Sequence, residues 1–371
     1  MTIVFVVNSG SSSIKWELID VKSSARVRGG IVERIGEAGA VADHAAAMVD
    51  ILAELGDELP AVIGHRVVHG GSVFRAATVV TDEVERQIDE LSALAPLHNP
   101  ANLLGLRAAR TAFPGVPNVA VFDTAFHQTL APDAYTYAID VDVALANGVR
   151  RYGFHGTSYR FVSRAAAALL QKPLENLKLI VFHLGNGASV CAIDGGRSVD
   201  TSMGMTPLEG LVMGTRSGDI DAGALMHLGR AGFSFDDLNG LLNRRSGLLG
   251  LSGRGDMRDV QSAAEAGDAA AQAALDVYYH RLRHYLGAYL VELGGVDAIV
   301  FTAGVGENSP ATRAATVSGL EGLGIEVDGV LNSARQGGAR LVSSSRSVVK
   351  VLVVPTNEEL EIARQSVALL G

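Results

Sequence analysis

Two stretches of the sequence combine the parts of a phosphate-binding turn: an apolar strand, a polar side chain and a run of glycine and serine. The first is IVFVVNSGSSSIK, from Ile3 to Lys15, where Asn8 precedes the turn. The second is LIVFHLGNGASVC, from Leu179 to Cys191, where His183 holds the same place. Backbone N–H groups in such a turn can approach an anion closely because glycine has no Cβ. The repetition at the head of each half indicates a duplicated nucleotide-handling fold that holds a phosphate chain between its halves.

Charged side chains elsewhere supply the chemistry of phosphoryl transfer. Arg66, in GHRVVHGG, and Arg216, in MGTRSGD, can each bind a carboxylate or a phosphate through two hydrogen bonds. Asp123 and Glu358 are separated carboxylates that can bind Mg²⁺ together with phosphate oxygens, because Mg²⁺ takes few protein ligands. Positioning and charge stabilisation of this kind supply most of the catalysis in phosphoryl transfer. Neutral donors complete the set: Asn8, His155 and Asn186.

Structural roles stay open for several of these residues. Arg66 and Arg216 could form structural ion pairs, and Asp123 follows an apolar strand at a position typical of a helix cap. His280 and His284 are four residues apart on a predicted helix and could meet one metal ion, but no third ligand is evident. We therefore interpret them as packing residues. The chain has no GxxxxGKS/T loop, no GxGxxG after a strand and no HExxH.

The spacing of apolar residues predicts an α/β protein in which each half opens with a β-hairpin. Alternating strands and helices indicate sheets covered by helices, and the hairpins make those sheets mixed. The predicted strands are Ile3–Val7, Ile14–Ile19, about Arg28–Ile35, Val62–Val68, Val119–Phe122, Leu179–Phe182, Ser189–Ala192, Ala298–Thr302 and Val349–Val354. The predicted helices are Asp43–Leu55, Asp82–Leu94, Asn102–Phe113, Ser158–Leu170, a long region from about Asp219 to Leu293 broken near Gly247–Asp256, and Glu358–Leu369.

The composition limits the function classes. The 371 residues are enough for two domains with sizeable cores, and the net charge of −9 argues against a nucleic-acid partner. No apolar run approaches the ~20 residues that a membrane helix needs, and the N-terminus lacks the features of an export signal. The single cysteine, Cys191, lies in an apolar strand. We therefore expect a buried thiol and a reducing, cytoplasmic location with no membrane partner.

The order of the motifs, from VVNSGSSSIK to PTNEEL, resembles the acetate kinase (acetokinase) family of the acetate and sugar kinase/heat-shock-protein/actin superfamily. The resemblance implies two duplicated actin-like (ribonuclease H-like) domains with mixed sheets and a central cleft. One domain is expected at residues 1–125 plus 356–371 and the other at residues 126–355. The resemblance also implies a homodimer with its interface in the second domain. The implied reaction is reversible transfer of the ATP γ-phosphoryl group to acetate, which gives acetyl phosphate and ADP and requires Mg²⁺, with Mn²⁺ as the alternative metal.

The resemblance assigns a role to each matching residue. The expected catalytic set is Asp123, Arg66, Arg216 and His155, of which His155 and Arg216 stabilise the phosphoryl group in transfer. The expected metal ligands are Asn8 and Glu358. The expected acetate site is Arg66 with an apolar pocket of Val68, Leu97, Phe154 and Pro207. The expected nucleotide contacts are Ser11, Ser13, Lys15, His183, Asn186, Gly187, Asp256, Met257, Arg258, Gly304, Val305, Gly306 and Asn308.

The sequence departs from the family pattern in two places. The segment between the opening hairpin and HRVVHGG is shorter, which trims the first domain. Arg254–Gly255 stands where Ser-rich sequence is expected, in SGRGDMRD.

Acetate is already ionised at neutral pH, so the expected mechanism is direct in-line transfer without a general base. The minority alternative is a phosphorylated enzyme carboxylate, for example at Glu358. Propionate or butyrate is the alternative substrate, because one methylene changes binding by only ~1–3 kcal/mol. An actin-like ATPase without a small-acid substrate is a further alternative, which the two arginines and the apolar pocket disfavour.

Overall fold

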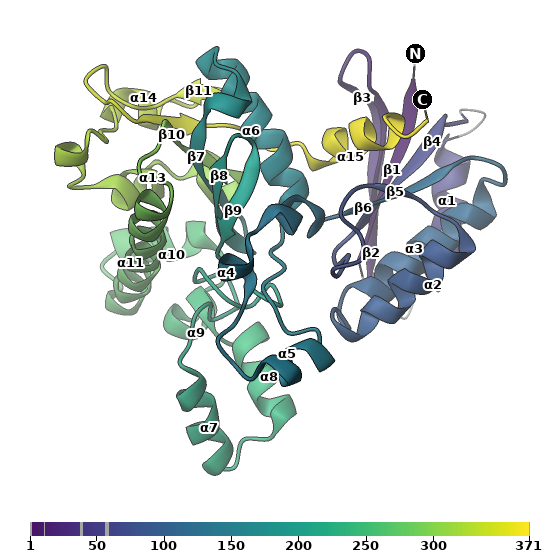
Figure 1. The fold of residues 1–371 in the computed structure, drawn as a ribbon, viewed down its shortest axis with the longest axis horizontal. Coiled ribbons are helices and arrows are strands. Elements are labelled where there is room, and N and C mark those ends of the chain that lie inside the picture. Colours follow the sequence, from purple (N-terminus) through teal and green to yellow (C-terminus); the bar gives the residue numbers. More distant parts are fainter. Residues whose placement is uncertain (1, 11, 38–39, 56–58, 371) are drawn as a thin grey trace. The chain divides into compact units, whose positions relative to one another are not determined.

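The computed structural model describes residues 2–10, 12–37, 40–55 and 59–370, which form two compact units (Figure 1). Unit 1 comprises residues 1–128, 154–161 and 357–371, and unit 2 comprises residues 129–153 and 162–356. Helix α6 (Gly156–Leu170) begins in unit 1 and ends in unit 2. None of the helices in the described part of the chain has the length and apolar character needed to span a bilayer.

Unit 1 contains one six-stranded sheet with the strand order β3-β2-β1-β4-β6-β5. Strands β1, β2 and β3 form an antiparallel meander, whereas β4 and β6 continue the sheet in parallel with β1. The short edge strand β5 pairs antiparallel with β6. The bounds are β1 (Ile3–Ser9), β2 (Ser13–Asp20), β3 (Ala25–Glu33), β4 (Val62–Val67), β5 (Thr78–Val79) and β6 (Asn118–Phe122).

Alternation along β1 explains how helices cover both faces of this sheet. Phe5 and Val7 pack with residues of α1 and α3, while Val4 and Val6 pack with residues of α15. Successive side chains of a strand point to opposite faces, so one apolar run serves two cores. Figure 1 shows α1, α2 and α3 on one side of the sheet and α15 on the other. The bounds are α1 (His44–Leu55), α2 (Asp82–Glu90), α3 (Asn99–Ala112) and α15 (Glu358–Val367), with short 3₁₀ turns at Leu91–Ala93 and Ala125–Thr129.

Unit 2 repeats the topology of unit 1. Its sheet has the order β11-β12-β10-β7-β8-β9, which matches unit 1 strand for strand when β7 corresponds to β1. The pairings have the same directions, and the register shifts between the second and third strand in both units. The duplicated mixed sheets predicted from the two hairpins are therefore confirmed. The bounds are β7 (Lys178–Leu184), β8 (Ala188–Asp194), β9 (Arg197–Thr201), β10 (Ala298–Thr302), β11 (Arg340–Leu341) and β12 (Lys350–Val353).

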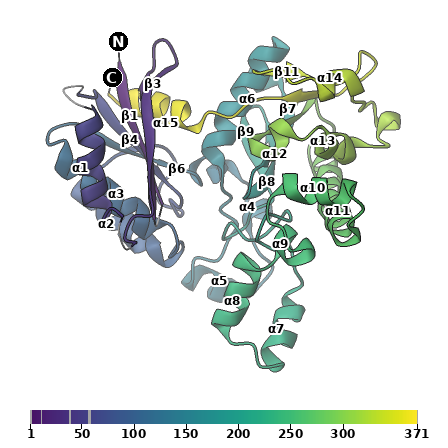
Figure 2. The same ribbon diagram turned by 180° about the vertical axis from the view of Figure 1, so that it is seen from behind.

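The helices of unit 2 include a group that packs beside the sheet. Helices α11 and α12 contact β7, and α10, α11 and α13 lie side by side in both views (Figures 1 and 2). The bounds are α4 (Pro132–Tyr135), α5 (Val141–Ala146), α7 (Ala222–Arg230), α8 (Phe235–Arg244), α9 (Gly247–Ser252), α10 (Met257–Glu265), α11 (Ala269–Glu292), α12 (Ala303–Asn308), α13 (Pro310–Val317) and α14 (Gly329–Ser333), with 3₁₀ turns at Leu174–Asn176 and Glu321–Leu323.

The prediction of one long helical region from 219 to 293 was wrong in detail. The region holds five helices, α7 to α11, and α9 forms inside the stretch where we expected a break. Gly247 starts α9 with a φ of +62°, and a Cβ there would lie 2.1 Å from the Met213 carbonyl oxygen. The Leu248 N–H donates to that same oxygen, so α9 is held by Met213 rather than by its own helix propensity. Strands β5, β9 and β11 were not predicted.

Candidate active site

The first predicted phosphate turn joins β1 to β2. Asn8 pairs with Lys15 in the hairpin register, and the Gly10 N–H donates to the Ser13 carbonyl at 2.7 Å. Ser11 lies outside the described residues. Lys15 does not point freely into solution: its ammonium group is paired with Glu359 of α15 and lies 3.6 Å from Glu17. Burial disfavours the charged lysine, but these two carboxylates outweigh burial and raise its pKa.

Arg66 and Asp123 form a tight ion pair in unit 1. Arg66 is the fifth residue of β4, and Asp123 follows the last residue of the adjacent parallel strand β6, so both lie near the same edge of the sheet. The guanidinium donates to Asp123 Oδ2 at 2.7 and 3.0 Å and to Oδ1 at 3.2 Å. Burial disfavours the charge of Arg66, but Asp123 and Glu358 outweigh burial and raise its pKa. Asp123 is 1% exposed, so Arg66 is the counter-ion of a buried carboxylate.

Glu358 adds a carboxylate that has no ion-pair partner among the described residues. It is the first residue of α15, behind the Asn357 cap whose side chain accepts from the Leu360 N–H. Burial raises the pKa of Glu358 to about 7; Arg66 opposes this shift, and Asp123 and Glu359 add to it. A bound cation would relieve this repulsion. Within the described ranges, no three His, Cys, Asp or Glu side chains gather to hold a metal alone. The oxygen donors Asn8 and Glu358 suit Mg²⁺, which takes its other ligands from phosphate and water.

His155 and Gly156 bring the start of α6 against Asp123. His155 has a φ of +57°, which is uncommon for a residue with a side chain and typical of functional sites. The Gly156 N–H donates to the Asp123 carbonyl oxygen at 2.9 Å, and a Cβ at 156 would lie only 2.2 Å from that oxygen. The next residue, Thr157, donates its hydroxyl to Asp123 Oδ1 at 3.4 Å. The backbone therefore fixes His155 and the Asp123 carboxylate together.

The residues expected to wall the acyl pocket differ in burial. Val68 and Phe154 are buried, at 8% and 2% exposure, whereas Leu97 is 53% exposed. Val68 follows β4 directly after Arg66 and Val67, and the side-chain oxygen of Asn102 accepts from its N–H at 3.0 Å. Pro207, the fourth residue of this set, belongs to unit 2 and is partly buried.

The second predicted phosphate turn joins β7 to β8 in unit 2. The Gly185 N–H donates to the Gly187 carbonyl at 3.1 Å, which closes the turn. Asn186 at its tip is exposed, and its carbonyl accepts from the Gly214 N–H at 3.0 Å. His183 lies inside β7 and is buried.

Arg216 carries a charge that no described carboxylate balances. Its Nη1 donates to the Pro207 carbonyl at 2.6 Å, and it forms no ion pair with a residue that the structure describes. Burial lowers the pKa of this guanidinium. A partly buried arginine whose strongest contact is one carbonyl is suited to bind an anion.

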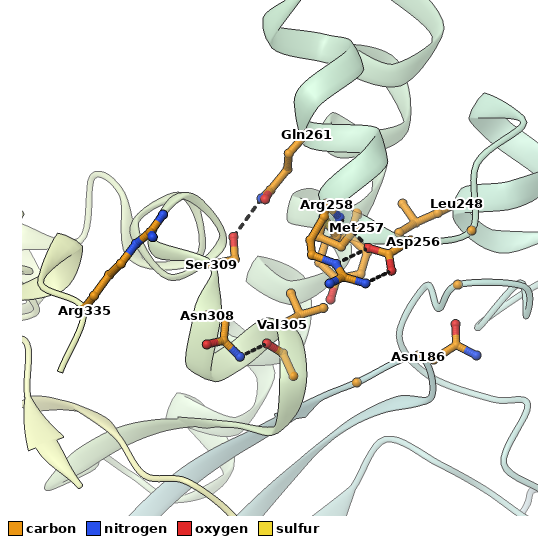
Figure 3. Close-up of a pocket in the computed structure, with 15 residues that line it drawn as sticks. Asn186, Leu248, Asp256, Met257, Arg258, Gln261, Val305, Asn308, Ser309 and Arg335 are labelled. Atoms are coloured by element: carbon orange, nitrogen blue, oxygen red, sulfur yellow. Dashed lines mark hydrogen bonds and ion pairs between the residues drawn. The ribbon is translucent and has the colours of Figure 1, made fainter. Parts of the chain in front are cut away.

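A cavity of about 760 Å³ opens beside the second turn (Figure 3). Several predicted nucleotide contacts line it: Asn186, Asp256, Met257, Arg258, Gly304, Val305 and Asn308. Gly187 and Gly306 are not in its lining. Arg258 binds Asp256 through two hydrogen bonds of 2.6 and 3.0 Å, which together with the Arg258 N–H hold the Asp256 pKa at about 2. Asp256 also caps α10, so this pair fixes the cavity wall at the helix start.

The cavity includes residues that sequence reasoning missed. Gln261 lies one helical turn after Met257 on α10, and this i, i+4 spacing was the signal that could have found it. Ser309 ends the motif TAGVGENS and precedes Pro310 at the start of α13, which is the pattern of a helix cap. No local pattern marks Arg335, which follows α14. Tyr278 of α11 also lines the cavity; its buried hydroxyl has no hydrogen-bond partner among the described residues.

Comparison with known proteins gives a consistent result. The sequence profile of the acetokinase family matches residues 37–364. The acetate kinase of Clavibacter michiganensis subsp. michiganensis is 61% identical over 392 residues, which cover 99% of both chains. The crystal structure of Porphyromonas gingivalis acetate kinase superposes with a TM-score of 0.96 at 40% identity and covers 100% of both chains. A propionate kinase from Francisella tularensis superposes with a TM-score of 0.93 at 38% identity, covering 99% of this chain and 100% of that one.

Proposed function

Because the chain belongs to the acetokinase family, we propose that it transfers the γ-phosphoryl group of ATP reversibly to acetate, giving acetyl phosphate and ADP. The observation that carries this proposal is the 61% identity to an acetate kinase over 99% of both chains. The two candidate sites support it with an unbalanced arginine, a carboxylate without an ion-pair partner among the described residues, and a cavity beside a glycine turn.

In this proposal the unit 1 cluster binds acetate and the metal. Arg66 keeps an Nη1 that is not engaged with Asp123, so it can still donate to the acetate carboxylate. Asp123 fixes the guanidinium in place, and Val68, Leu97 and Phe154, with Pro207, surround the methyl group. Asn8 and Glu358 would hold Mg²⁺, which supplies charge neutralisation at the phosphate oxygens. Mn²⁺ is the alternative metal.

In this proposal unit 2 supplies most of the groups that bind the nucleotide and the phosphoryl group, and the first turn and His155 of unit 1 supply the others. The cavity takes the nucleoside, with Asp256, Met257 and Arg258 on one wall and Gly304, Val305 and Asn308 on another. Gly306 lies on the same helix, α12, and supports that second wall from outside the lining. The turn at Asn186 and Gly187, with His183 behind it, and the first turn at Ser11, Ser13 and Lys15 take phosphate oxygens. Arg216 and His155 stabilise the phosphoryl group in transfer.

The reaction needs alignment and charge neutralisation rather than proton transfer. Acetate is ionised at neutral pH, so a carboxylate oxygen can attack the γ-phosphorus directly while the bond to the ADP oxygen breaks. The charges of Arg66 and Arg216 reduce the repulsion between two anionic reactants. We propose that transfer is in-line, with no phosphorylated enzyme carboxylate.

Propionate is the second candidate substrate, and the likeness to a propionate kinase at 38% identity is the observation that favours it. Both acids present the same carboxylate to Arg66. They differ by one methylene, which the apolar wall must accept or reject.

We further propose a cytoplasmic homodimer whose domains follow residues 1–125 plus 356–371 and residues 126–355. The buried single thiol of Cys191 supports a reducing location. Exposed apolar side chains around α5 support an interface in the second domain: Ile139, Val141, Val143 and Leu145 are each at least 51% exposed.

The decisive experiment traps acyl phosphate with hydroxylamine. Purified protein is mixed with ATP, Mg²⁺ and acetate, propionate or butyrate in parallel, and acyl hydroxamate and ADP are both measured. We expect acetyl hydroxamate in proportion to ADP. Release of ADP at the same rate with and without any acid, and no hydroxamate, would favour an actin-like ATPase instead.

A further inference from the structure

Gln261 on α10 lines the candidate nucleotide cavity with a side chain whose orientation is fixed (Figure 3). Resting on the proposed function, we propose that Gln261 Oε1 accepts a hydrogen bond from the 6-amino group of adenine and thereby selects ATP against GTP. Gln261 would then be the specificity-determining residue for the nucleotide base.

A hydrogen-bond network sets the direction of the Gln261 amide. Its Nε2 lies 2.8 Å from Ser309 Oγ, 3.2 Å from the Tyr279 hydroxyl and 3.3 Å from Thr312 Oγ1. Ser309 Oγ accepts from the Thr312 N–H at 3.2 Å and donates its own hydrogen to Thr312 Oγ1 at 2.9 Å. Because Ser309 has no second hydrogen to give, the amide must present its N–H₂ to it. The amide oxygen is then the free end.

The amide oxygen accepts no hydrogen bond from any residue that the structure describes, although Gln261 is only partly exposed. Side chains that line ligand cavities commonly use such an acceptor to orient a ligand, because a polar group that loses its water when a ligand binds needs a new partner. The neighbouring hydroxyls of Ser309 and Thr312 hold the amide and leave its rotation little freedom. A residue that lines the cavity therefore carries a preorganised acceptor.

The position of Gln261 within the cavity suits the base. The glycine turn that holds Gly185 and Asn186 lines the cavity and is the proposed place of the phosphates. Figure 3 shows Asn186 and Gln261 well apart, with Asp256, Met257 and Arg258 between them. A nucleotide with its phosphates at the turn directs its base away from them, toward Gln261 and Ser309.

Hydrogen-bond chemistry gives the direction of selectivity. Adenine carries an N–H₂ donor at position 6, whereas guanine carries an oxygen acceptor there. An amide oxygen fixed in place accepts from the first and repels the second. Sites built on such a hydrogen bond discriminate against analogues that lack the matching group.

The test combines a side-chain change with a change in the ligand. Turnover with acetate and equilibrium binding by calorimetry are measured for ATP, GTP and purine riboside triphosphate, which lacks the 6-amino group. The proteins are the wild type, Gln261→Met, the shortened Gln261→Asn, and the control Gln272→Met on the exposed side of α11. We expect Gln261→Met to lower kcat/KM for ATP by about 3–10-fold through KM, with kcat and the KM for acetate kept.

The decisive comparison is between two losses of kcat/KM: the loss on removing the 6-amino group from the nucleotide and the loss on replacing Gln261. In the wild type, kcat/KM for purine riboside triphosphate should be lower than that for ATP by the same factor that Gln261→Met produces with ATP. In Gln261→Met, kcat/KM for the two nucleotides should be equal. The preference for ATP over GTP should fall only in the Gln261 variants. Independent, multiplying losses, or an unchanged ATP-to-GTP ratio in both variants, would overturn the proposal. Should the wild type bind ATP in preference to GTP but phosphorylate no acid, the proposed function fails while the base-reading role stands.

Discussion

Arg66 and Arg216 carry the same charge in different surroundings. Arg66 makes three close contacts to a carboxylate that is 1% exposed, whereas Arg216 makes one to a backbone carbonyl. Removing Arg66 would leave Asp123 buried without its counter-ion, which typically destabilises a fold by about 3–5 kcal/mol. Arg216 can be removed without stranding a charge, so it gives the cleaner test of catalysis.

Arg216→Ala should lose catalysis and keep stability. Removal of one preorganised donor commonly lowers the rate by roughly 10²–10³. We expect kcat to fall by at least that factor with an unchanged melting temperature, measured by the hydroxamate assay and calorimetry. Arg197→Ala, an exposed position on β9, is the matched control and should keep full activity. Near-normal turnover of Arg216→Ala would remove this arginine from the reaction.

Glu358→Gln should raise the Mg²⁺ requirement. The amide keeps the shape of the side chain but gives up the charge that would hold the metal, so half-maximal activity should need at least about tenfold more Mg²⁺. A Mg²⁺ titration at saturating ATP and acetate measures it, with the exposed Glu321→Gln as control. Superimposable titrations for the two variants would show that Glu358 does not bind the metal.

Val68→Ala should shift the acid preference toward propionate. The change removes two methyl groups from a buried wall position and makes room for about one carbon. The ratio of kcat/KM for propionate to that for acetate should rise, by an amount equivalent to at most ~1–3 kcal/mol. Competition assays with both acids decide the point. If the ratio stays at the wild-type value, Val68 does not contact the acyl chain.

At the scale of elements, the sequence predicted the strands that are long and apolar and that a nearby turn marks. The strands of both hairpins were found because each is a run of apolar residues beside a glycine turn. Strands β5 and β11 have two residues each, too few for any periodicity. Strand β9 has the mixed sequence RSVDT, and only its correspondence to β3 in the duplicated fold could have indicated it.

Strand β9 also carries a carboxylate, Asp200, whose ionised form is disfavoured by burial. Asp200 pairs in register with Ala192, and burial raises its pKa to about 6; Arg151 and the Thr201 N–H oppose the shift. The folded chain thus binds this proton more tightly than the unfolded chain, whose ordinary value is 3.8. Ionisation therefore removes stability as the pH rises from about 4 to about 6, and the full loss persists above that.

Asp200→Asn should remove this pH-dependent loss. The amide oxygen can still accept from the Thr201 N–H but cannot ionise. Relative to the wild type, the variant should gain roughly 1–3 kcal/mol between pH 4 and pH 8, seen as a melting temperature higher by a few degrees at pH 8 only. Asp194→Asn, exposed on β8, should show no such trend. A gain that is equal at both pH values would point to packing instead.

At the scale of the whole molecule, the candidate sites were predictable as sets of residues but not as sets of contacts. The motifs named Arg66 on a strand, Asp123 directly after a strand and Glu358 at the start of the last helix. The pairing of Lys15 with Glu359 joins residues 344 positions apart, and no local pattern contains such a partner. The role proposed for Gln261 likewise depends on hydroxyls from α11 and α13.

The prediction of a buried thiol is confirmed for Cys191, which is fully buried in β8 and has a pKa raised by burial. The thiolate is the reactive form, so this cysteine should resist alkylation and disulfide exchange in the folded protein. Ellman's reagent should detect almost no thiol in native protein and one per chain in denaturant. Rapid reaction of the native protein would contradict the burial.

An inert single cysteine makes this chain a clean background for spectroscopic probes. Cysteines introduced at Asp50 on α1 and Gln272 on α11, both exposed and in different units, could carry spin labels without removing the native residue first. The separation between the labels could then be followed as ATP and acetate are added in turn. Because the native thiol of Cys191 is buried and does not compete for the labels, motion during turnover can be measured directly.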